Sequence, residues 1–502
     1  MVRGVLALPL IAVTLFGVLL GLPSESTGEW LTEEIVDPAD STVQLTSEGS
    51  HWCVTVDRWG TVHAAWEDWR TVEDSDIRYS SRASGADWGA ESFQVNQDGS
   101  YAQNPAVCTD GSGNVFVAWQ DERPTHGVFE IWYRMYDAAS GWDSTEAVLD
   151  NPLEKSAHAP SAAMDDDGNV HVVWLRDTTV PRNKLLYKKF SPGTGWSATE
   201  KLSVGVAGVS EHPVIAEKDG ILHVVWSQYT IAAGTCVYYT RFDPEAGWDS
   251  LATNLGIGDH PSIALDPSAY IHVVWDFEEE VVYRRWTPEA GWEPSIYEVT
   301  EEDGIPSGHA TVARDGIGNV HVIWQDYVVG SHISLYERIC DPDTGWGEVT
   351  SPIGEAWRTE RPHLTADVCG NLHLVWSDGR SGYCCMLYYK EWDTAASSVT
   401  LDEGVLAPPP GLGIRAAPNP TRGATTITYL NDHTCTSGEV IVSIYDVRGQ
   451  LLRRLPMDES SAGMVVSWDG RDHFGRSLAP GTYFCVVSAC NQGQAHKVVL
   501  MK

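Results

Sequence analysis

The sequence predicts an all-β fold, with a seven-bladed β-propeller followed by a small Ig-like β-sandwich. Three observations support this prediction. A short apolar segment that ends in tryptophan occurs seven times, at steps of 49 to 55 residues. Each step contains four strand-like stretches separated by turn residues. The composition changes after Trp392, and from about residue 413 the period is lost and a different pattern of alternating strands begins.

The repeated segment is typified by DDDGNVHVVW at residues 165–174. A fixed period of about 50 residues indicates a repeat architecture. Apolar runs bounded by Gly, Asp and Asn are typical of strands. The tryptophans that end the seven copies are Trp66, Trp119, Trp174, Trp226, Trp275, Trp324 and Trp376.

Each period is expected to form one blade of four strands. The first strand is of the type PSIALD (261–266), and a turn such as DGIGN (315–319) leads from it into the HVVW strand. A third strand with tyrosine follows, as in VYYTRF (237–242), and a tight turn such as DPEAGW (243–248) opens the fourth strand. Four short strands at this period fit a propeller blade.

The Gly-Trp type starts of the fourth strand predict how the ring closes. The first of them lies ahead of the first complete repeat, whereas the seventh repeat ends at residues 386–392 with no fourth strand after it. We therefore expect residues 28–46 to supply the outer strand of the last blade, which leaves only short sheet edges. The seven starts centre on Trp30, Trp88, Trp142, Trp196, Trp248, Trp292 and Trp346.

The two ends of the chain predict export and a second domain. Residues 1–27 read as a signal peptide, because Arg3 precedes a long apolar run and then a polar stretch; a retained N-terminal anchor is the alternative. Residues 28–393 are assigned to the propeller. Residues 394–412 contain small residues and a triple proline and read as a linker. Residues 413–502 alternate strands and turns and predict the small sandwich.

The composition narrows the range of partners. The formal net charge of −36 argues against nucleic acids and anionic membranes as partners. No segment after the signal peptide is apolar enough to span a bilayer. Ten cysteines in an exported chain permit disulfides, and two of Cys435, Cys485 and Cys490 could pair. No cofactor motif and no metal-ligand motif is present, so we expect neither a cofactor nor a metal ion.

The C-terminal part resembles two related bacterial families. The shared features are the PNP start at 418–420, the IYDVRG hairpin at 444–449, the WDGRDHFGRSLAPGTYF stretch at 468–484 and a final strand that ends in lysine. One family is the Ig-like domain of flagellar hook-capping proteins, and the other is the C-terminal sorting domain of type IX secretion substrates. The resemblance implies a β-sandwich that directs export to the cell surface or serves as a structural appendage, without catalysis.

The repeat region, residues 28–393, resembles the sialidase-like propellers of the Asp-box (BNR-repeat) group. The shared feature is a glycine-containing turn before the fourth strand, as in SPGTGW (191–196). The Asp-box itself reads SxDxGxxW, whereas here tryptophan directly follows glycine, and sialidases of that group have six blades. The resemblance implies three arginines on a sugar carboxylate, a Tyr/Glu nucleophile pair and an aspartate as acid/base.

The histidine of the HVVW segment is predicted to be structural. It recurs in six of the seven copies, and Phe116 replaces it in the remaining one. A residue repeated in nearly every blade is a poor candidate for a single site, and an apolar substitute indicates packing. The six histidines are His63, His171, His223, His272, His321 and His373.

A second set is predicted to bind a ligand. Counting back fifteen residues from each tryptophan, with one deletion in the fourth repeat, reaches the start of the innermost strand, and these starts are expected to surround one mouth of the central channel. Imidazoles and an arginine there suit an anionic ligand. A metal ion is not expected, because a seven-fold ring should be too wide for imidazoles to reach one ion at about 2.0–2.1 Å. The alternative is a strand start that merely caps backbone groups. The candidates are His51, Asn104, Ala159, His212, His260, His309 and Arg361, with His158 beside Ala159.

Residues just after the tryptophans supply the candidates for catalysis. Arginine occurs four residues after three of them, and aspartate occurs two residues after four of them. Arginine forks suit carboxylates, but local salt bridges within the turns are the alternative. The candidates are Arg70, Arg123, Arg380, Asp68, Asp121 and Asp378, and Asp326 shares the aspartate position.

These features together predict a secreted or cell-surface binding module for an extracellular glycan or protein. The export machinery is the expected partner of residues 413–502, and nucleic acid is not expected. An exo-glycosidase of the sialidase type is the first alternative, and a structural component of a surface layer is the second.

Overall fold

The structure of the protein is a computed structural model. The described residues form strands and turns, with no helix among them and hence no helix able to cross a membrane. The expected signal peptide (1–27) and nearly all of the expected linker (394–412) lie outside them. The described residues are 28–37, 54–68, 75–89, 92–97, 101–123, 127–150, 155–178, 184–202, 208–301, 304–328, 332–354, 358–379, 386–394, 413–417, 424–430, 441–445, 451–456, 458–460, 463–471, 476, 478, 481–489 and 492–500.

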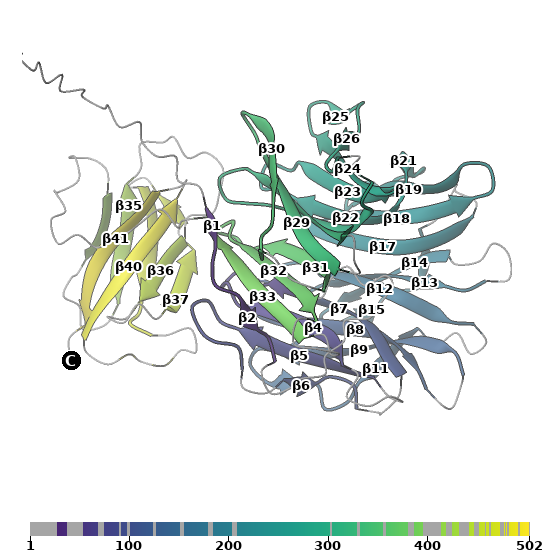
Figure 1. The fold of residues 1–502 in the computed structure, drawn as a ribbon. Helices are drawn as coiled ribbons and strands as arrows, with labels where there is room; N and C mark the ends of the chain where they lie inside the picture. Colours follow the sequence, from purple (N-terminus) through teal and green to yellow (C-terminus); the bar gives the residue numbers. More distant parts are fainter. Residues whose placement is uncertain are drawn as a thin grey trace, which may run out of the picture.

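Seven antiparallel sheets surround a common axis and form a seven-bladed propeller (Figure 1). The prediction of an all-β propeller with seven blades is confirmed. The first blade consists of β3 (Val54–Val56), β4 (Val62–Asp68), β5 (Asp76–Arg82) and β6 (Phe93–Gln94). The second consists of β7 (Tyr101–Thr109), β8 (Val115–Glu122), β9 (Phe129–Asp137), β10 (Gly141–Trp142) and β11 (Ala147–Asp150). The third consists of β12 (Ala157–Met164), β13 (Val170–Arg176), β14 (Lys184–Ser191), β15 (Gly195–Trp196) and β16 (Glu200–Lys201).

The other blades follow the same order, with the first strand of each innermost. These innermost strands contact one another in the order β3, β7, β12, β17, β22, β27, β31 and back to β3. The fourth blade consists of β17 (Val209–Lys218), β18 (Ile221–Thr230), β19 (Gly234–Asp243), β20 (Gly247–Trp248) and β21 (Thr253–Ile257). The fifth consists of β22 (Asp259–Leu265), β23 (Ile271–Phe277), β24 (Glu280–Thr287), β25 (Gly291–Trp292) and β26 (Tyr297–Glu298). The sixth consists of β27 (Ser307–Arg314), β28 (Val320–Val328), β29 (His332–Asp341) and β30 (Gly345–Thr350).

The seventh blade joins the two ends of the ring. Its inner strands are β31 (Thr359–Ala366), β32 (Leu372–Asp378) and β33 (Met386–Asp393), and its outer edge comes from β1 (Glu29–Trp30) and β2 (Glu34–Ile35). Trp30 lies opposite Trp392 in the register of β1 with β33. The N-terminal segment therefore completes the last blade, and the purple β1 runs beside the green β33 in Figure 1.

An aspartate-led turn joins the first two strands of a blade. In the third blade, Asp165 Oδ1 accepts the backbone N–H groups of Asp167 (3.1 Å) and Asn169 (2.8 Å). Gly168 takes the left-handed conformation that the turn requires, with φ of 75°. The side chain thus satisfies the turn's own backbone donors, which explains why DDDGN precedes an apolar strand.

The histidine of the HVVW segment is buried and belongs to the core. His171 Nδ1 lies 2.8 Å from the Tyr187 hydroxyl on the neighbouring strand. Phe116 takes the histidine's place in the second blade, where it is fully buried and stacks on Tyr133. The predicted structural role of these histidines is confirmed. The same His–Tyr contact of 2.7 to 2.9 Å joins His63 to Tyr79, His223 to Tyr239, His272 to Tyr283 and His373 to Tyr389.

The sixth blade departs from this pattern. Glu337 stands where the other blades have tyrosine, and its Oε1 lies 2.8 Å from His321 Nδ1. Asp315 Oδ2 lies 3.2 Å from the other ring nitrogen. Burial by itself would lower the pKa of His321, but hydrogen bonds and charges from the two carboxylates raise it to about 9. His321 is therefore a buried imidazolium at neutral pH.

Neighbouring blades interlock through tryptophan and tyrosine. The tryptophan that opens a fourth strand packs edge-on against the third-strand tyrosine of the preceding blade. Trp30 makes the corresponding contact at the closure, where its Nε1 donates to Glu337 Oε2 (2.8 Å). The edge-on pairs are Tyr79–Trp142, Tyr133–Trp196, Tyr187–Trp248, Tyr239–Trp292, Tyr283–Trp346 and Tyr389–Trp88, with ring centroids 5.0 to 5.3 Å apart.

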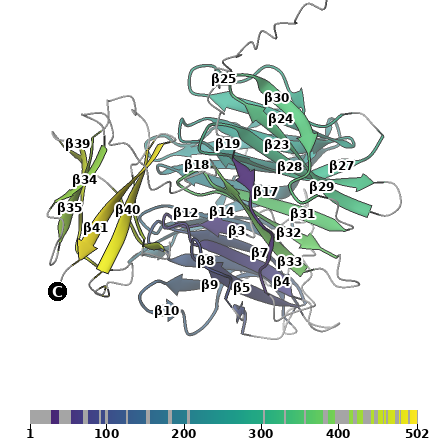
Figure 2. The same cartoon turned by 60° about the vertical axis from the view of Figure 1, so that its left-hand side comes forward.

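The C-terminal part is a small β-sandwich of two four-stranded sheets (Figure 2). Trp468 and Tyr483 face each other across its core, with ring centroids 5.6 Å apart. Cys485 is buried in the same core, whereas Cys435 and Cys490 lie outside the described residues. One sheet contains β34 (Gly413–Ala417), β35 (Thr425–Leu430), β39 (Gly463–Trp468) and β38 (Asp458–Ser460), and the other contains β37 (Leu451–Pro456), β36 (Ile441–Tyr445), β40 (Gly481–Ala489) and β41 (Gln492–Leu500).

Candidate functional site

The innermost strands of six blades carry a β-bulge at the position that the sequence singled out. The pairing between first and second strand shifts its register there. The residue at the bulge has a φ of 47° to 54°, which is left-handed backbone. We call these residues the axial ring: Asn104, Ala159, His212, His260, His309 and Arg361. His51, the seventh candidate, lies outside the described residues.

The backbone of the axial ring is strained. Left-handed backbone costs about 1–2 kcal/mol for residues other than glycine, and Ala159 and Arg361 are of types that adopt it least readily among these six. A bulge also redirects the side chain relative to a regular strand. Strain of this kind persists where the surrounding structure enforces it, and it is concentrated at functional sites.

The residue directly after the tryptophan of a second strand holds the axial-ring residue of the next blade in place. Gln120 Oε1 accepts the backbone N–H of Ala159 (3.0 Å), and Gln325 Oε1 accepts that of Arg361 (2.8 Å). Asp276 Oδ2 accepts the N–H of His309 (3.1 Å). Sequence reasoning missed this role. Its signal was a polar residue directly after the tryptophan, inside an otherwise apolar strand.

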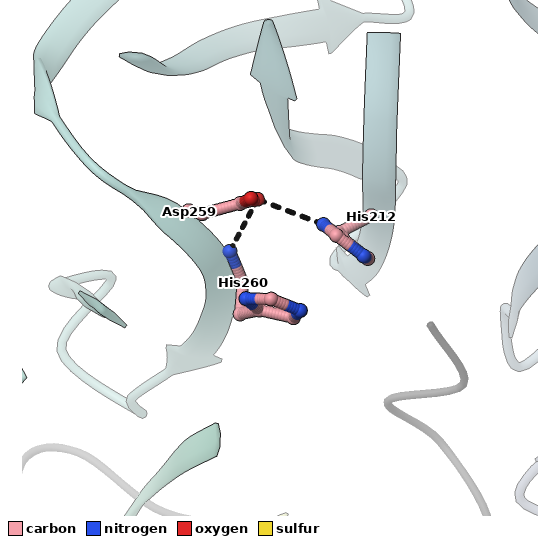
Figure 3. Close-up of side chains that lie close together, drawn as sticks. All are labelled: His212, Asp259 and His260. Carbon is pink, nitrogen blue, oxygen red and sulfur yellow. Dashed lines mark hydrogen bonds and ion pairs between the residues drawn. The ribbon is translucent and has the colours of Figure 1, made fainter. Parts of the chain in front are cut away.

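Three histidines of the axial ring come together from consecutive blades. The rings of His212 and His260 stack with centroids 3.9 Å apart, and His309 meets His260 edge-on at 4.7 Å. Asp259 Oδ1 lies 2.8 Å from His212 Nδ1 and also accepts the backbone N–H of His260 (2.8 Å). Figure 3 shows both imidazoles extending to the same side, away from Asp259. Asp276 Oδ2 lies 3.4 Å from His260 Nδ1.

The electrostatics of this cluster keep two of its imidazoles neutral at pH 7. Burial, followed by the neighbouring His212, lowers the pKa of His260 to about 4. Burial and His260 together with Arg361 lower the pKa of His309 to about 3. Burial alone would raise the pKa of Asp259, but the hydrogen bond from His212 and the histidine charges hold it well below its usual range. Burial raises the pKa of Asp276 to about 7.

Some polar atoms of the ring are buried without a hydrogen-bond partner among the described residues. They are Arg361 Nη1 and Asn104 Oδ1, and Asp276 Oδ1 beside the ring is in the same state. Asn104 Nδ2, in contrast, donates to Gln120 Oε1 (2.8 Å). Buried polar groups nearly always have partners in the protein, in water or in a ligand. The ring therefore offers both donors and acceptors to a molecule bound at the axis.

His158, the candidate beside Ala159, pairs with an aspartate of its own blade. Its Nε2 lies 3.4 Å from Asp177 Oδ1 at the end of the neighbouring strand. The structure thus brings His212, His260 and His309 together, whereas His158 pairs within its own blade.

The candidates after the tryptophans have local partners. Arg123 Nη2 contacts Glu146 Oε1 (2.6 Å) and Asp121 Oδ2 (3.3 Å), and its guanidinium lies over Trp132. Asp121 and Asp378 also accept their own blade's tryptophan Nε1, at 3.2 and 3.3 Å. The remaining aspartates pair similarly, with Asp68 receiving Arg78 Nε (3.2 Å) and Asp326 receiving Trp324 Nε1 (2.7 Å). Arg70 and Arg380 lie outside the described residues.

Adjacent blades bring possible metal ligands close together, although a seven-fold ring was expected to be too wide. His212, Asp259 and His260 each offer a ligand atom, and these three atoms lie within 4.8 Å of one another. The expectation treated the ring as a full circle. Ligand spacing instead depends on the distance between neighbouring innermost strands, which is short near the axis.

Two exposed tyrosines flank the ring at the ends of second strands. Tyr229 is 46% exposed and lies opposite Val209, three residues before His212. Tyr327 is 44% exposed and directly follows Asp326. Asp326 lies opposite Ser307, and Ser307 stands two residues before His309. Sequence reasoning missed them because tyrosine recurs throughout the repeats.

Comparison with known proteins identifies the C-terminal domain. Residues 421–493 match the FlgD Ig-like domain family. No curated protein matches the chain. The match covers most of the sandwich.

Several solved structures are similar to this chain at low sequence identity. A fungal alcohol oxidase of the AA5 family, in complex with copper, is 13% identical, with 95% of this chain and 100% of that chain covered and a TM-score of 0.53. A Hadza microbial sialidase is 11% identical over 62% of this chain and 73% of its own, with a TM-score of 0.39. The Aleuria aurantia lectin bound to α-methyl-L-fucoside is 14% identical over 63% and 100%, also at 0.39.

Proposed function

We propose that this protein is a secreted or cell-surface binding module that holds an extracellular glycan at the axial ring. The observation that carries the proposal is the buried Arg361 Nη1, which has no hydrogen-bond partner among the described residues. A guanidinium donor in this state suits an anionic acceptor, and a sugar carboxylate accepts two parallel hydrogen bonds from arginine.

The shape of the site supports binding rather than turnover. The backbone bulge is the same in six blades, while the side chains on it differ, from Asn104 to Arg361. Such a ring is already formed before a ligand arrives, so binding loses little ordering free energy. Hydroxyl groups of a sugar can donate to Asn104 Oδ1, a buried acceptor without a partner among the described residues.

The flanking tyrosines support a carbohydrate rather than a small inorganic anion. Tyr229 and Tyr327 present an apolar ring face together with a hydroxyl group. This combination suits a sugar ring, which has C–H faces and polar edges. The formal charge of −36 disfavours long polyanions. We therefore favour a short oligosaccharide with a single carboxylate.

The C-terminal sandwich has a separate role in this proposal. Its match to the FlgD Ig-like domain over residues 421–493 supports a structural or attachment role outside the cytoplasm. We propose that residues 413–502 engage the export machinery or the cell surface. Deletion of this domain should then change where the protein is found without changing its glycan affinity.

A glycan array followed by calorimetry tests the binding proposal. The full-length protein should bind acidic oligosaccharides, and Arg361→Gln should weaken binding about 10-fold or more, because a charged hydrogen bond contributes about 1.5–3 kcal/mol. Arg285→Gln is the matched control, since Arg285 lies opposite His272 at the far end of its blade's second strand. The proposal fails if the intact protein binds no glycan, or if the two variants behave alike.

A further inference from the structure

The clustered histidines His212, His260 and His309 have the features of a ligand set. They come from the innermost strands of three consecutive blades, β17, β22 and β27. Their rings are in contact, at centroid distances of 3.9 and 4.7 Å. Two imidazole nitrogens bound to one tetrahedral ion at about 2.0–2.1 Å lie about 3.3 Å apart. Small side-chain rotations would bring stacked imidazoles to that spacing.

Two carboxylates stand behind these imidazoles. Asp259 Oδ1 lies 2.8 Å from Nδ1 of His212, and Asp276 Oδ2 lies 3.4 Å from Nδ1 of His260. Histidines that bind metal ions typically donate their other ring N–H to a carboxylate, which fixes the tautomer and the orientation of the ring. With Nδ1 directed to a carboxylate, Nε2 is the nitrogen that would bind the ion.

A second feature also points to a positive charge. Asp276 Oδ1 is buried and has no hydrogen-bond partner among the described residues. Asp259 and Asp276 place two carboxyl groups beside the imidazoles of His212 and His260. Burying carboxylates is costly unless a cation or a hydrogen bond compensates them. A divalent cation between the imidazoles would provide that compensation.

We infer that His212, His260 and His309 form a binding site for one divalent transition-metal ion, with Asp259 and Asp276 orienting the imidazoles. Imidazole ligands suit ions of the zinc, copper and nickel group, whereas calcium and magnesium prefer oxygen. Three histidines leave a position open on the ion, so an oxygen of a bound molecule could complete the coordination.

Metal binding at these histidines does not depend on a bound glycan, and it is measured without one. A failure to bind metal would leave the glycan proposal intact, and a failure to bind glycan would leave this one intact. The full-length protein, without a histidine tag and stripped with a chelator, is titrated with zinc chloride by calorimetry. We expect one ion per chain, bound at micromolar concentrations or below.

Asparagine substitutions provide the variants, because Asn104 occupies the equivalent bulge of the second blade and shows that asparagine fits its backbone. His212→Asn and His260→Asn should each weaken zinc binding at least 100-fold. Asp259→Asn should weaken it about 10- to 100-fold. His158→Asn, whose imidazole pairs with Asp177, is the matched control and should leave zinc affinity unchanged. Circular dichroism verifies that each variant folds.

Electron paramagnetic resonance of the copper(II)-loaded protein gives a second readout. Nitrogen hyperfine splitting from two or three imidazoles is expected, and His260→Asn should remove one nitrogen. The inference is overturned if the intact protein binds zinc no better than at millimolar concentrations. It is also overturned if His260→Asn and His158→Asn bind zinc equally, or if the copper spectrum shows oxygen ligands alone.

Discussion

Replacing His171 with phenylalanine should reverse its effect on stability between neutral and acidic pH. His171 is buried, and its Nδ1 lies 2.8 Å from the Tyr187 hydroxyl. The phenyl ring fits, because Phe116 fills the same place in the second blade and is fully buried. The substitution therefore removes polar and charge effects while it preserves the packing.

At neutral pH the variant should be less stable by about 1 kcal/mol, the typical value of one lost hydrogen bond. A larger penalty is not expected, because Trp248 offers a second donor beside the Tyr187 ring. The two rings pack edge-on with centroids 5.1 Å apart, and the buried Trp248 Nε1 has no hydrogen-bond partner among the described residues. In the second blade the corresponding tyrosine, Tyr133, accepts the Trp196 Nε1 at 2.9 Å.

At acidic pH the order should invert. Burial, aided by Lys189, lowers the pKa of His171 to about 4 in the folded protein, against about 6.5 when unfolded. The unfolded chain therefore binds more protons between these values, and stability falls as pH drops from 6.5 through 4. The loss at pH 4.5 amounts to about 2.5 kcal/mol, which the phenylalanine variant does not suffer. The variant should then be more stable than the parent by about 1.5 kcal/mol.

Thermal unfolding followed by circular dichroism at pH 7.5 and pH 4.5 measures the stability difference between variant and parent at both pH values. For a domain of this size, 1 kcal/mol corresponds to about 2 °C in melting temperature. Tyr187→Phe is the control, because it removes the same hydrogen bond but retains the imidazole, and it should be destabilised at both pH values. A His171→Phe variant with the same sign of change at both pH values would refute the reasoning.

Three further predictions concern the sixth blade, the closure and catalysis. Protonated His321, whose pKa is about 9, contributes stability that is fully present below pH 6.5 and is lost as pH rises through 9. In the Glu337→Tyr variant the melting temperature should therefore fall less between neutral and alkaline pH. Trp30→Ala should lower the melting temperature of the whole propeller, by an amount comparable to Trp88→Ala and worth about 3 kcal/mol; an unchanged value would contradict the closure. A fluorogenic sialoside should not be hydrolysed, since Arg123 is held by its neighbours; turnover that Arg123→Ala abolishes would revive the sialidase alternative.

The positions of the axial-ring residues could be predicted from the sequence. Counting back from the tryptophans found the six bulged positions without any knowledge of the bulge. The count worked because strand lengths and turns repeat from blade to blade. The departures from the pattern were equally visible in the sequence, such as Phe116 in place of histidine.

The contacts that candidate residues make in space could not be predicted from the sequence. Arg123 looked like a carboxylate ligand, but Glu146, 23 residues later, holds it in place. Gln325 was not singled out by the sequence, but it fixes the backbone of Arg361 in the next blade. Both contacts join segments whose separation along the chain says nothing of their distance in space.

The sequence by itself determined the architecture of this protein. Period, turn chemistry and two-residue alternation are local properties, and a ring of seven similar blades is what local repetition builds. Only the tertiary structure decided the site. A bulge inserts one residue and redirects the side chains around it, which alternation cannot predict. The fixed spacing located His212, His260 and His309, but the contact between their rings depends on that redirection and on the close approach of innermost strands near the axis.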